Sequence, residues 1–159
     1  MRLLLLFLLI PFLFLQTACE KRAPQTGQRV IAEAVRALLD KAYAGIDYPT
    51  YRDNLKELEA ITAQHLDTTP WHLRPQAEQM LNYLQTAEAI LRWQAEQSNV
   101  GTPSADDQAV AIWIERYPFL RAALGARTAN VFDVPTAVTL LWDKTNAILP
   151  SFQIKSKPL

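Results

Sequence analysis

Residues 75–97 are PQAEQMLNYLQTAEAILRWQAEQ, and their apolar side chains recur every three or four positions. That spacing predicts one long helix, with its proline in the first turn, where proline is tolerated. The apolar side chains form two adjacent stripes, and the polar arc that remains is narrow. A helix with so wide an apolar face must be covered on two sides, so we expect it at the centre of a helical bundle. The first stripe contains Met80, Leu84, Ala87 and Leu91, and the second contains Tyr83, Ile90 and Trp93.

Four further segments show the same helical periodicity, and a strand-like alternation of apolar and polar residues is not found after the N-terminal region. The fold class is therefore predicted to be all-α, a bundle of about five helices. Residues 119–124 are expected to add a short helical turn. The four segments are residues 28–44, 50–66, 104–117 and 133–150.

Signals for helix ends accompany these segments. Gly45 follows the first segment and predicts its C-terminal stop. Thr50, with Asp53 three residues later, predicts the start of the second helix as a capping pair. Ser104 and Asp107 predict the start of the fourth helix in the same way.

The charge balance is neutral, because 16 Lys and Arg side chains face 16 Asp and Glu side chains among 159 residues. A nucleic-acid-binding protein needs a basic stripe, so this balance argues against a nucleic-acid partner. Residues 28–150 are numerous enough to bury a core as one helical domain. We expect residues 151–159 to form a loose tail.

The N-terminus has the pattern of a targeting segment. Met1 and Arg2 are followed by an apolar run over residues 3–15, which is 13 residues long. A membrane-spanning helix needs about 20 apolar residues, so this run is short for a span and has the length of a signal peptide. Cys19, the only cysteine, follows the run. We predict a signal peptide over residues 1–18.

Cys19, preceded by Thr17 and Ala18, resembles the lipobox of bacterial lipoproteins, although Gln16 stands where that family usually has Leu. The resemblance implies cleavage before Cys19, a diacylglycerol on its thiol and an acyl group on the new amine. Glu20 rather than Asp after the cysteine implies the outer membrane, facing the periplasm, if the source has two membranes. Residues 19–27 then form the lipidated cysteine and a polar tether.

Groups for catalysis or metal binding are sparse. The four serines fall in predicted loops, caps or the tail, and none stands in a nucleophile-elbow motif. His65 and His72 are seven residues apart, which matches no metal-ligand spacing. The carboxylates fall mostly on polar helix faces. The sequence therefore predicts no catalytic site, no metal site and no cofactor.

The aromatic residues allow two interpretations. Trp71, Trp93, Trp113 and Trp142 suit a packed core, because each carries a large apolar area. Alternatively, part of the second stripe stays open as a groove for a partner, because the linkers beside it are poor in large apolar residues. The residues of that candidate groove are Tyr83, Ile90, Trp93 and Trp142.

Three functional hypotheses remain. The first is a lipid-anchored helical binding or scaffold protein of the cell envelope, with the membrane and a protein as partners. The second is narrower: size, anchor and helix content resemble the pilotins, lipoproteins that escort secretion-channel subunits to the outer membrane. The third is an envelope enzyme or carrier with an apolar pocket between helices.

Overall fold

A computed structural model describes residues 27–97, 104, 106–125 and 131–152 of the chain. This described part contains five α-helices and three 3-10 helices, so the predicted all-α bundle of about five helices is confirmed. The predicted short turn near residue 120 is also present. The elements are α2 (Gly27–Tyr43), α3 (Tyr48–His65), η1 (Trp71–Leu73), α4 (Arg74–Gln97), α5 (Gln108–Arg116), η2 (Pro118–Ala123), α6 (Val134–Ile148) and η3 (Leu149–Phe152).

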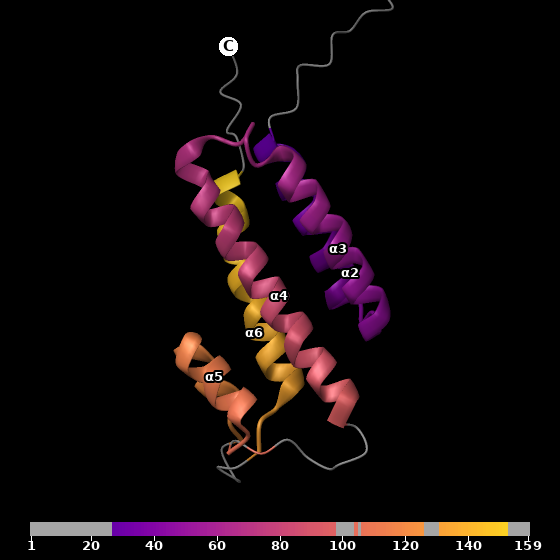
Figure 1. Cartoon of the computed structure of the whole chain (residues 1–159), viewed down its shortest axis with the longest axis vertical. Helices are drawn as coiled ribbons and strands as arrows, with labels where there is room; N and C mark the ends of the chain where they lie inside the picture. Colours follow the sequence, from indigo (N-terminus) through magenta and orange to yellow (C-terminus); the bar gives the residue numbers. More distant parts are fainter. Residues whose placement is uncertain (1–26, 98–103, 105, 126–130, 153–159) are drawn as a thin grey trace, which may run out of the picture.

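The four long helices run side by side, and each reverses the direction of the long helix before it (Figure 1). Helix α4 packs against α3 and also against α6, while α2 packs mainly against α3. The short helix α5 lies beside the lower part of α6, and η2 connects the two by packing against both. Helix α4 is therefore covered on two sides, as its wide apolar face predicted.

One end of the bundle collects the beginning and the end of the described chain. Helix α2 begins there, and η3 contacts α2 at the same end (Figure 1). Gly27 lies so close to the carbonyl of His65 and the hydroxyl of Thr68 that an added Cβ would collide with both. We call this end, formed by Gly27, residues 66–73 and η3, the entry end.

The core follows the predicted stripes of α4. Met80, Leu84 and Ala87 are fully buried, and so is Ile90 from the second stripe. The second stripe therefore belongs to the core as well, because α6 and η2 cover it. Side chains from the rest of the described chain that are also fully buried include Ile31, Tyr51, Val110, Leu120, Phe132 and Leu141.

Tyr51 connects three helices through one buried hydroxyl. The Tyr51 side chain of α3 is fully buried, and its hydroxyl donates to the Leu84 carbonyl of α4 over 3.1 Å. The same oxygen accepts a hydrogen bond of 3.3 Å from Nε1 of Trp142 in α6. Burial raises the pKa of Tyr51, so the hydroxyl stays protonated and keeps its donor role.

Two helix starts differ from the predicted ones. Helix α3 begins at Tyr48, and Asp47 rather than Thr50 is its N-cap, since the Asp47 carboxylate accepts from the Thr50 backbone N–H over 2.8 Å. Helix α5 begins at Gln108, and Asp107 is its N-cap rather than a partner three residues inside a helix starting at Ser104. In both cases an aspartate satisfies free N–H groups that the predicted start had assigned to a hydroxyl.

The domain limits also differ slightly. Gly27, predicted to end the tether, is the first residue of α2, and residues 151–152 of the predicted loose tail belong to η3. Residues 1–26 and 153–159 lie outside the described residues, and with them the predicted signal peptide, Cys19 and the rest of the tail. Within the described part, no helix combines the length and the apolar character that crossing a membrane requires. Gly45 has φ +89°, the left-handed conformation expected of a residue that stops a helix.

Truncating the centre of α4 should cost far more than truncating its polar arc. We expect Leu84→Ala to lower the free energy of unfolding by about 2 to 5 kcal/mol, because the site is fully buried. Glu78→Ala, on the exposed side of the same helix, should change it by less than about 0.5 kcal/mol. Urea unfolding of both variants measures the difference, and equal losses would contradict the assigned helix rotation.

Removing the Tyr51 hydroxyl should destabilise the bundle without changing its shape. Tyr51→Phe leaves the Trp142 N–H without its partner, and we expect a loss of about 1 to 2 kcal/mol. The matched control is Tyr43→Phe, since the Tyr43 hydroxyl bonds Asp143 at the surface and its side chain is 48% exposed. In thermal unfolding, Tyr51→Phe should have a lower midpoint than Tyr43→Phe. The opposite result would show that the buried hydroxyl does not join the helices.

Candidate functional site

The candidate groove residues do not form one open surface. Tyr83 is only 9% exposed and Ile90 is fully buried. The ring of Tyr83 packs edge-on against Tyr117, with 5.4 Å between ring centroids, and against Phe119 of η2, with 6.0 Å. The prediction that part of this stripe stays open is therefore wrong for Tyr83 and Ile90: both are buried, and η2 and the residue before it cover Tyr83.

The two candidate tryptophans are half-buried and belong to different aromatic clusters. Trp93 packs edge-on against Trp113 of α5, with 5.7 Å between centroids. Trp142 packs against Tyr43 and Tyr51, with 5.7 and 5.9 Å between centroids. Most of these aromatic residues thus pack in or against the core, and the buried Tyr83 and Ile90 cannot form an open groove together with Trp93 and Trp142.

A polar cleft of about 430 Å³ opens instead between α3 and α4. Helix α3 contributes Tyr48, Arg52 and Lys56, which are four residues apart and so share one helix face. Helix α4 supplies the opposite wall. The complete lining is Tyr48, Arg52, Leu55, Lys56, Glu59, Gln85, Glu88 and Arg92.

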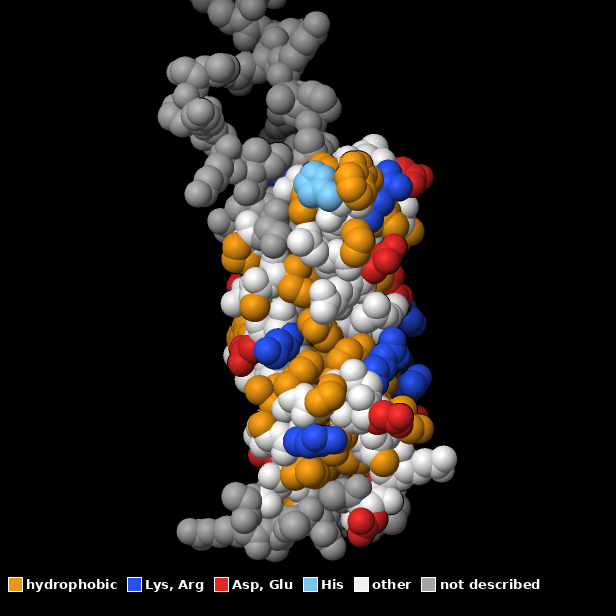
Figure 2. Space-filling model, turned by 90° about the vertical axis from the view of Figure 1, so that its left-hand side faces the viewer, with side chains coloured by type: hydrophobic (Ala, Val, Ile, Leu, Met, Phe, Trp, Pro, Cys, Tyr) orange, Lys and Arg blue, Asp and Glu red, His pale blue; other side chains and the backbone are white. Residues whose placement is uncertain are grey.

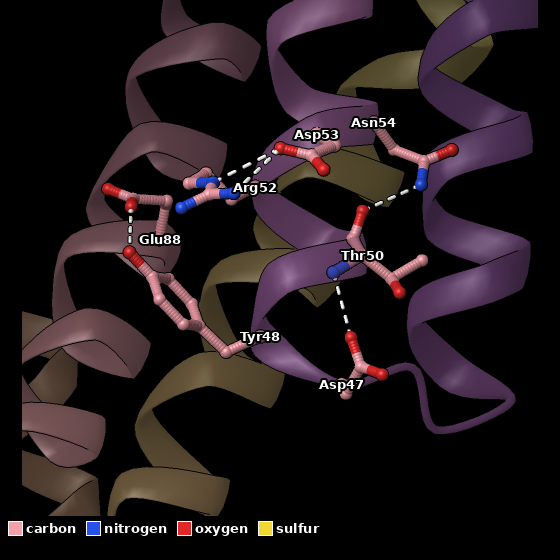
Figure 3. A network of polar contacts seen from close by, with 7 residues as sticks. All are labelled: Asp47, Tyr48, Thr50, Arg52, Asp53, Asn54 and Glu88. Carbon is pink, nitrogen blue, oxygen red and sulfur yellow. Dashed lines mark hydrogen bonds and ion pairs between the residues drawn. The ribbon is translucent and has the colours of Figure 1, made fainter.

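Hydrogen bonds across this cleft join its walls. The Tyr48 hydroxyl donates to Glu88 Oε1 over 2.9 Å, and Nε2 of Gln85 donates to Glu59 Oε1 over 2.8 Å (Figure 3 shows the first). Desolvation raises the pKa of Tyr48, and the hydrogen bond and charge of Glu88 raise it further. Each of the two carboxylates in the cleft therefore accepts from a neutral donor of the opposite wall.

The basic side chains of the cleft form fewer contacts than its carboxylates. Arg52 pairs with its neighbour Asp53, whose carboxylate is 3.1 Å away (Figure 3). Among the residues that the structure describes, Lys56 and Arg92 form no ion pair and no side-chain hydrogen bond. Two cations beside engaged carboxylates give the cleft a chemistry suited to a polar segment that carries carboxylates.

The two histidines take separate positions at the entry end. His65 is half-buried at the end of α3, and His72 is exposed in η1. Across the described ranges, no three His, Cys, Asp or Glu side chains are grouped so that they could hold a metal ion. Cys19 lies outside these ranges.

Trp71 departs from the predicted aromatic core, because its side chain is 80% exposed. Leu73 occupies the inward position of the single-turn helix η1, so Trp71 faces solvent. A signal for this was present in the sequence: the residues three and four positions after Trp71 are Arg74 and Pro75, so no apolar stripe continues from it. The sequence reasoning missed this surface.

Protonation of Asp47 should weaken the start of α3, which presents Tyr48 to the cleft. Hydrogen bonds from Thr50 lower the pKa of Asp47 below its usual value. A lowered pKa in the folded state means that the charged cap stabilises the protein above about pH 4 and that this contribution is lost as the pH falls further. Asp47→Asn keeps a cap but cannot titrate. We therefore expect its thermal midpoint to lie below that of the unsubstituted protein at pH 6, and the difference to disappear as the pH falls to about 2.5.

Asp47→Ala is the control for the cap itself. It should have a lower midpoint than Asp47→Asn at pH 6, since alanine cannot accept from the Thr50 N–H. A gap between the Asn variant and the unsubstituted protein that does not change with pH would contradict the role given to Asp47.

Comparison of the chain with protein-family models, with curated proteins and with solved structures finds no match. Function therefore has to be inferred from the geometry of this chain and from its N-terminal sequence.

Proposed function

We propose that the protein is a lipid-anchored helical binding protein of the cell envelope. The observation that carries this proposal is the position of Cys19, which only three residues separate from a short apolar run and which lies eight residues before the start of α2. An acylated cysteine at that position precedes the first helix of the described bundle in the sequence. Two or three acyl chains anchor a protein stably, whereas one chain anchors it only marginally.

The short tether keeps the bundle close to the membrane. Seven residues separate Cys19 from Gly27, so the fully extended chain from Cys19 to Gly27 spans about 29 Å at most. Gly27 lies close to His65 at the end of α3 and to Thr68, so the tether joins the bundle at the entry end. The anchored domain would thus present its entry end toward the lipid and its remaining surface to the periplasm or cell exterior.

The polar cleft between α3 and α4 favours a protein segment as the partner. Its walls carry charged and amide side chains. An apolar ligand would leave such groups desolvated without hydrogen bonds, at a cost of several kcal/mol (about 2 or more for each group). A segment with its own carboxylates could pair with Lys56 and Arg92.

Acylation at Cys19 is directly testable. We expect bacteria that express the full chain to incorporate labelled fatty acid into it, and the N-terminal peptide to carry the mass of acylated Cys19. Cys19→Ser should abolish both signals, because serine lacks the thiol. Its far-ultraviolet circular dichroism should keep the helical signal, since Cys19 precedes the first helix of the bundle.

A chain that remains unlabelled, or a Ser variant that is still labelled, would overturn the proposal. Glu78→Ala, an exposed change in α4, serves as the control and should be labelled like the unsubstituted chain.

A further inference from the structure

The exposed Trp71 lies at the end of the molecule where the tether leaves the bundle. Residues 66–73 form that end together with Gly27, which packs against His65 and Thr68. Figure 2 shows apolar side chains beside a histidine at this upper end of the molecule. The ring of His72 packs edge-on against Trp71, with 5.8 Å between centroids. A large apolar side chain is thus presented where the chain continues toward Cys19.

The connection that carries Trp71 is held by its own hydrogen bonds. The hydroxyls of Thr68 and Thr69 each donate to the His65 carbonyl over 3.0 Å. The Arg74 guanidinium donates to the carbonyls of Asp67 and Thr69 over 2.8 and 3.2 Å. These hydrogen bonds tie the connection to the end of α3 and to the start of α4. Trp71 is therefore presented to solvent by a segment that is held at both of its ends.

The lengths involved decide which end of the bundle can meet a membrane. The chain from Cys19 to Gly27 spans at most about 29 Å. Helix α4 has 24 residues and is therefore about 36 Å long. An anchor at Cys19 consequently keeps the entry end near the lipid whatever the orientation of the bundle.

We propose that Trp71 is a second membrane contact, which places its indole in the interfacial layer of the bilayer beside the acyl anchor. This inference rests on the acylation of Cys19 proposed above. Tryptophan is enriched at membrane–water interfaces, because its ring is apolar and its N–H can still bond polar groups. Asp67 and Arg74, the charged side chains of residues 66–74, have opposite signs and lie 3.9 Å apart, so the segment that carries Trp71 has no net negative charge toward lipid headgroups. With both contacts at the entry end, the bundle would stand away from the membrane.

Tryptophan fluorescence of the acylated full chain in vesicles tests this contact. The vesicles contain phosphatidylethanolamine and phosphatidylglycerol, with or without lipids brominated in their acyl chains. Subtracting the emission of Trp71→Phe from that of the unsubstituted chain isolates the Trp71 signal from the three other tryptophans. We expect this signal to be shifted to the blue, to lose most of its intensity with brominated lipid and to be protected from iodide in the aqueous phase.

The matched control places an exposed tryptophan on α5, away from the entry end (Figure 1). Ile112 of α5 is 54% exposed, so the double variant Trp71→Phe, Ile112→Trp presents an indole away from the entry end. The emission that this double variant shows in excess of Trp71→Phe comes from the new indole at position 112. This emission should be quenched by iodide and should not change with brominated lipid. An equal response of both positions to brominated lipid would overturn the proposed orientation.

The outcomes separate this inference from the proposed function. Acylated protein in which Trp71 is quenched by iodide and not by brominated lipid overturns the membrane contact and leaves the anchor standing. A blue shift that depends on protein concentration and not on lipid would show that Trp71 contacts a second copy of this chain. That result also overturns the proposed membrane contact. A chain without acyl groups on Cys19 overturns the proposed function, and the inference with it.

Discussion

The hydroxyl of Tyr51 is the constraint on which the arrangement of the long helices depends. A buried hydroxyl without partners is costly, so α3 must bring it to the free lone pair of the Leu84 carbonyl in α4. Helix α6 must then bring Trp142 to the same oxygen. Apolar packing alone would tolerate small sliding motions between helices, whereas these two directional contacts set the axial position of α3, α4 and α6 relative to one another.

The division of surface between the two proposed contacts follows from this arrangement. Because α3 and α4 are antiparallel neighbours, their polar faces meet along one line and form the cleft that Tyr48 and Glu88 bridge (Figure 3). The same antiparallel pair turns at residues 66–73, which places the exposed Trp71 at the end of the cleft-bearing hairpin. The proposed membrane contact and the proposed partner cleft thus use different parts of one helical hairpin and can be occupied together.

Helical periodicity predicted the elements well because burial of one face needs only a local repeat. The central segment is the best example: its two stripes required cover on two sides, and α4 has α3 and α6 there. Helix starts were less predictable, since Asp47 and Thr50 are both good caps in sequence and only the backbone conformation at Asp47, with φ −71° and ψ 163°, decides between them. The candidate groove failed at Tyr83 for a different reason, because Tyr117 and, in the apolar segment η2, Phe119 pack over its ring from more than thirty positions away along the chain.

The sequence by itself determined the all-α class, the central place of residues 75–97 and the neutral charge, because each depends on local repeats or on counts. It also contains the cysteine on which the proposed anchor rests. Only the tertiary structure decided which aromatic side chains are covered: Tyr83 is buried by residues more than thirty positions away, while Trp71 is left outside. The physical reason is that exposure is a property of the neighbours that packing brings, and the amphipathic pattern of a single segment does not specify those neighbours.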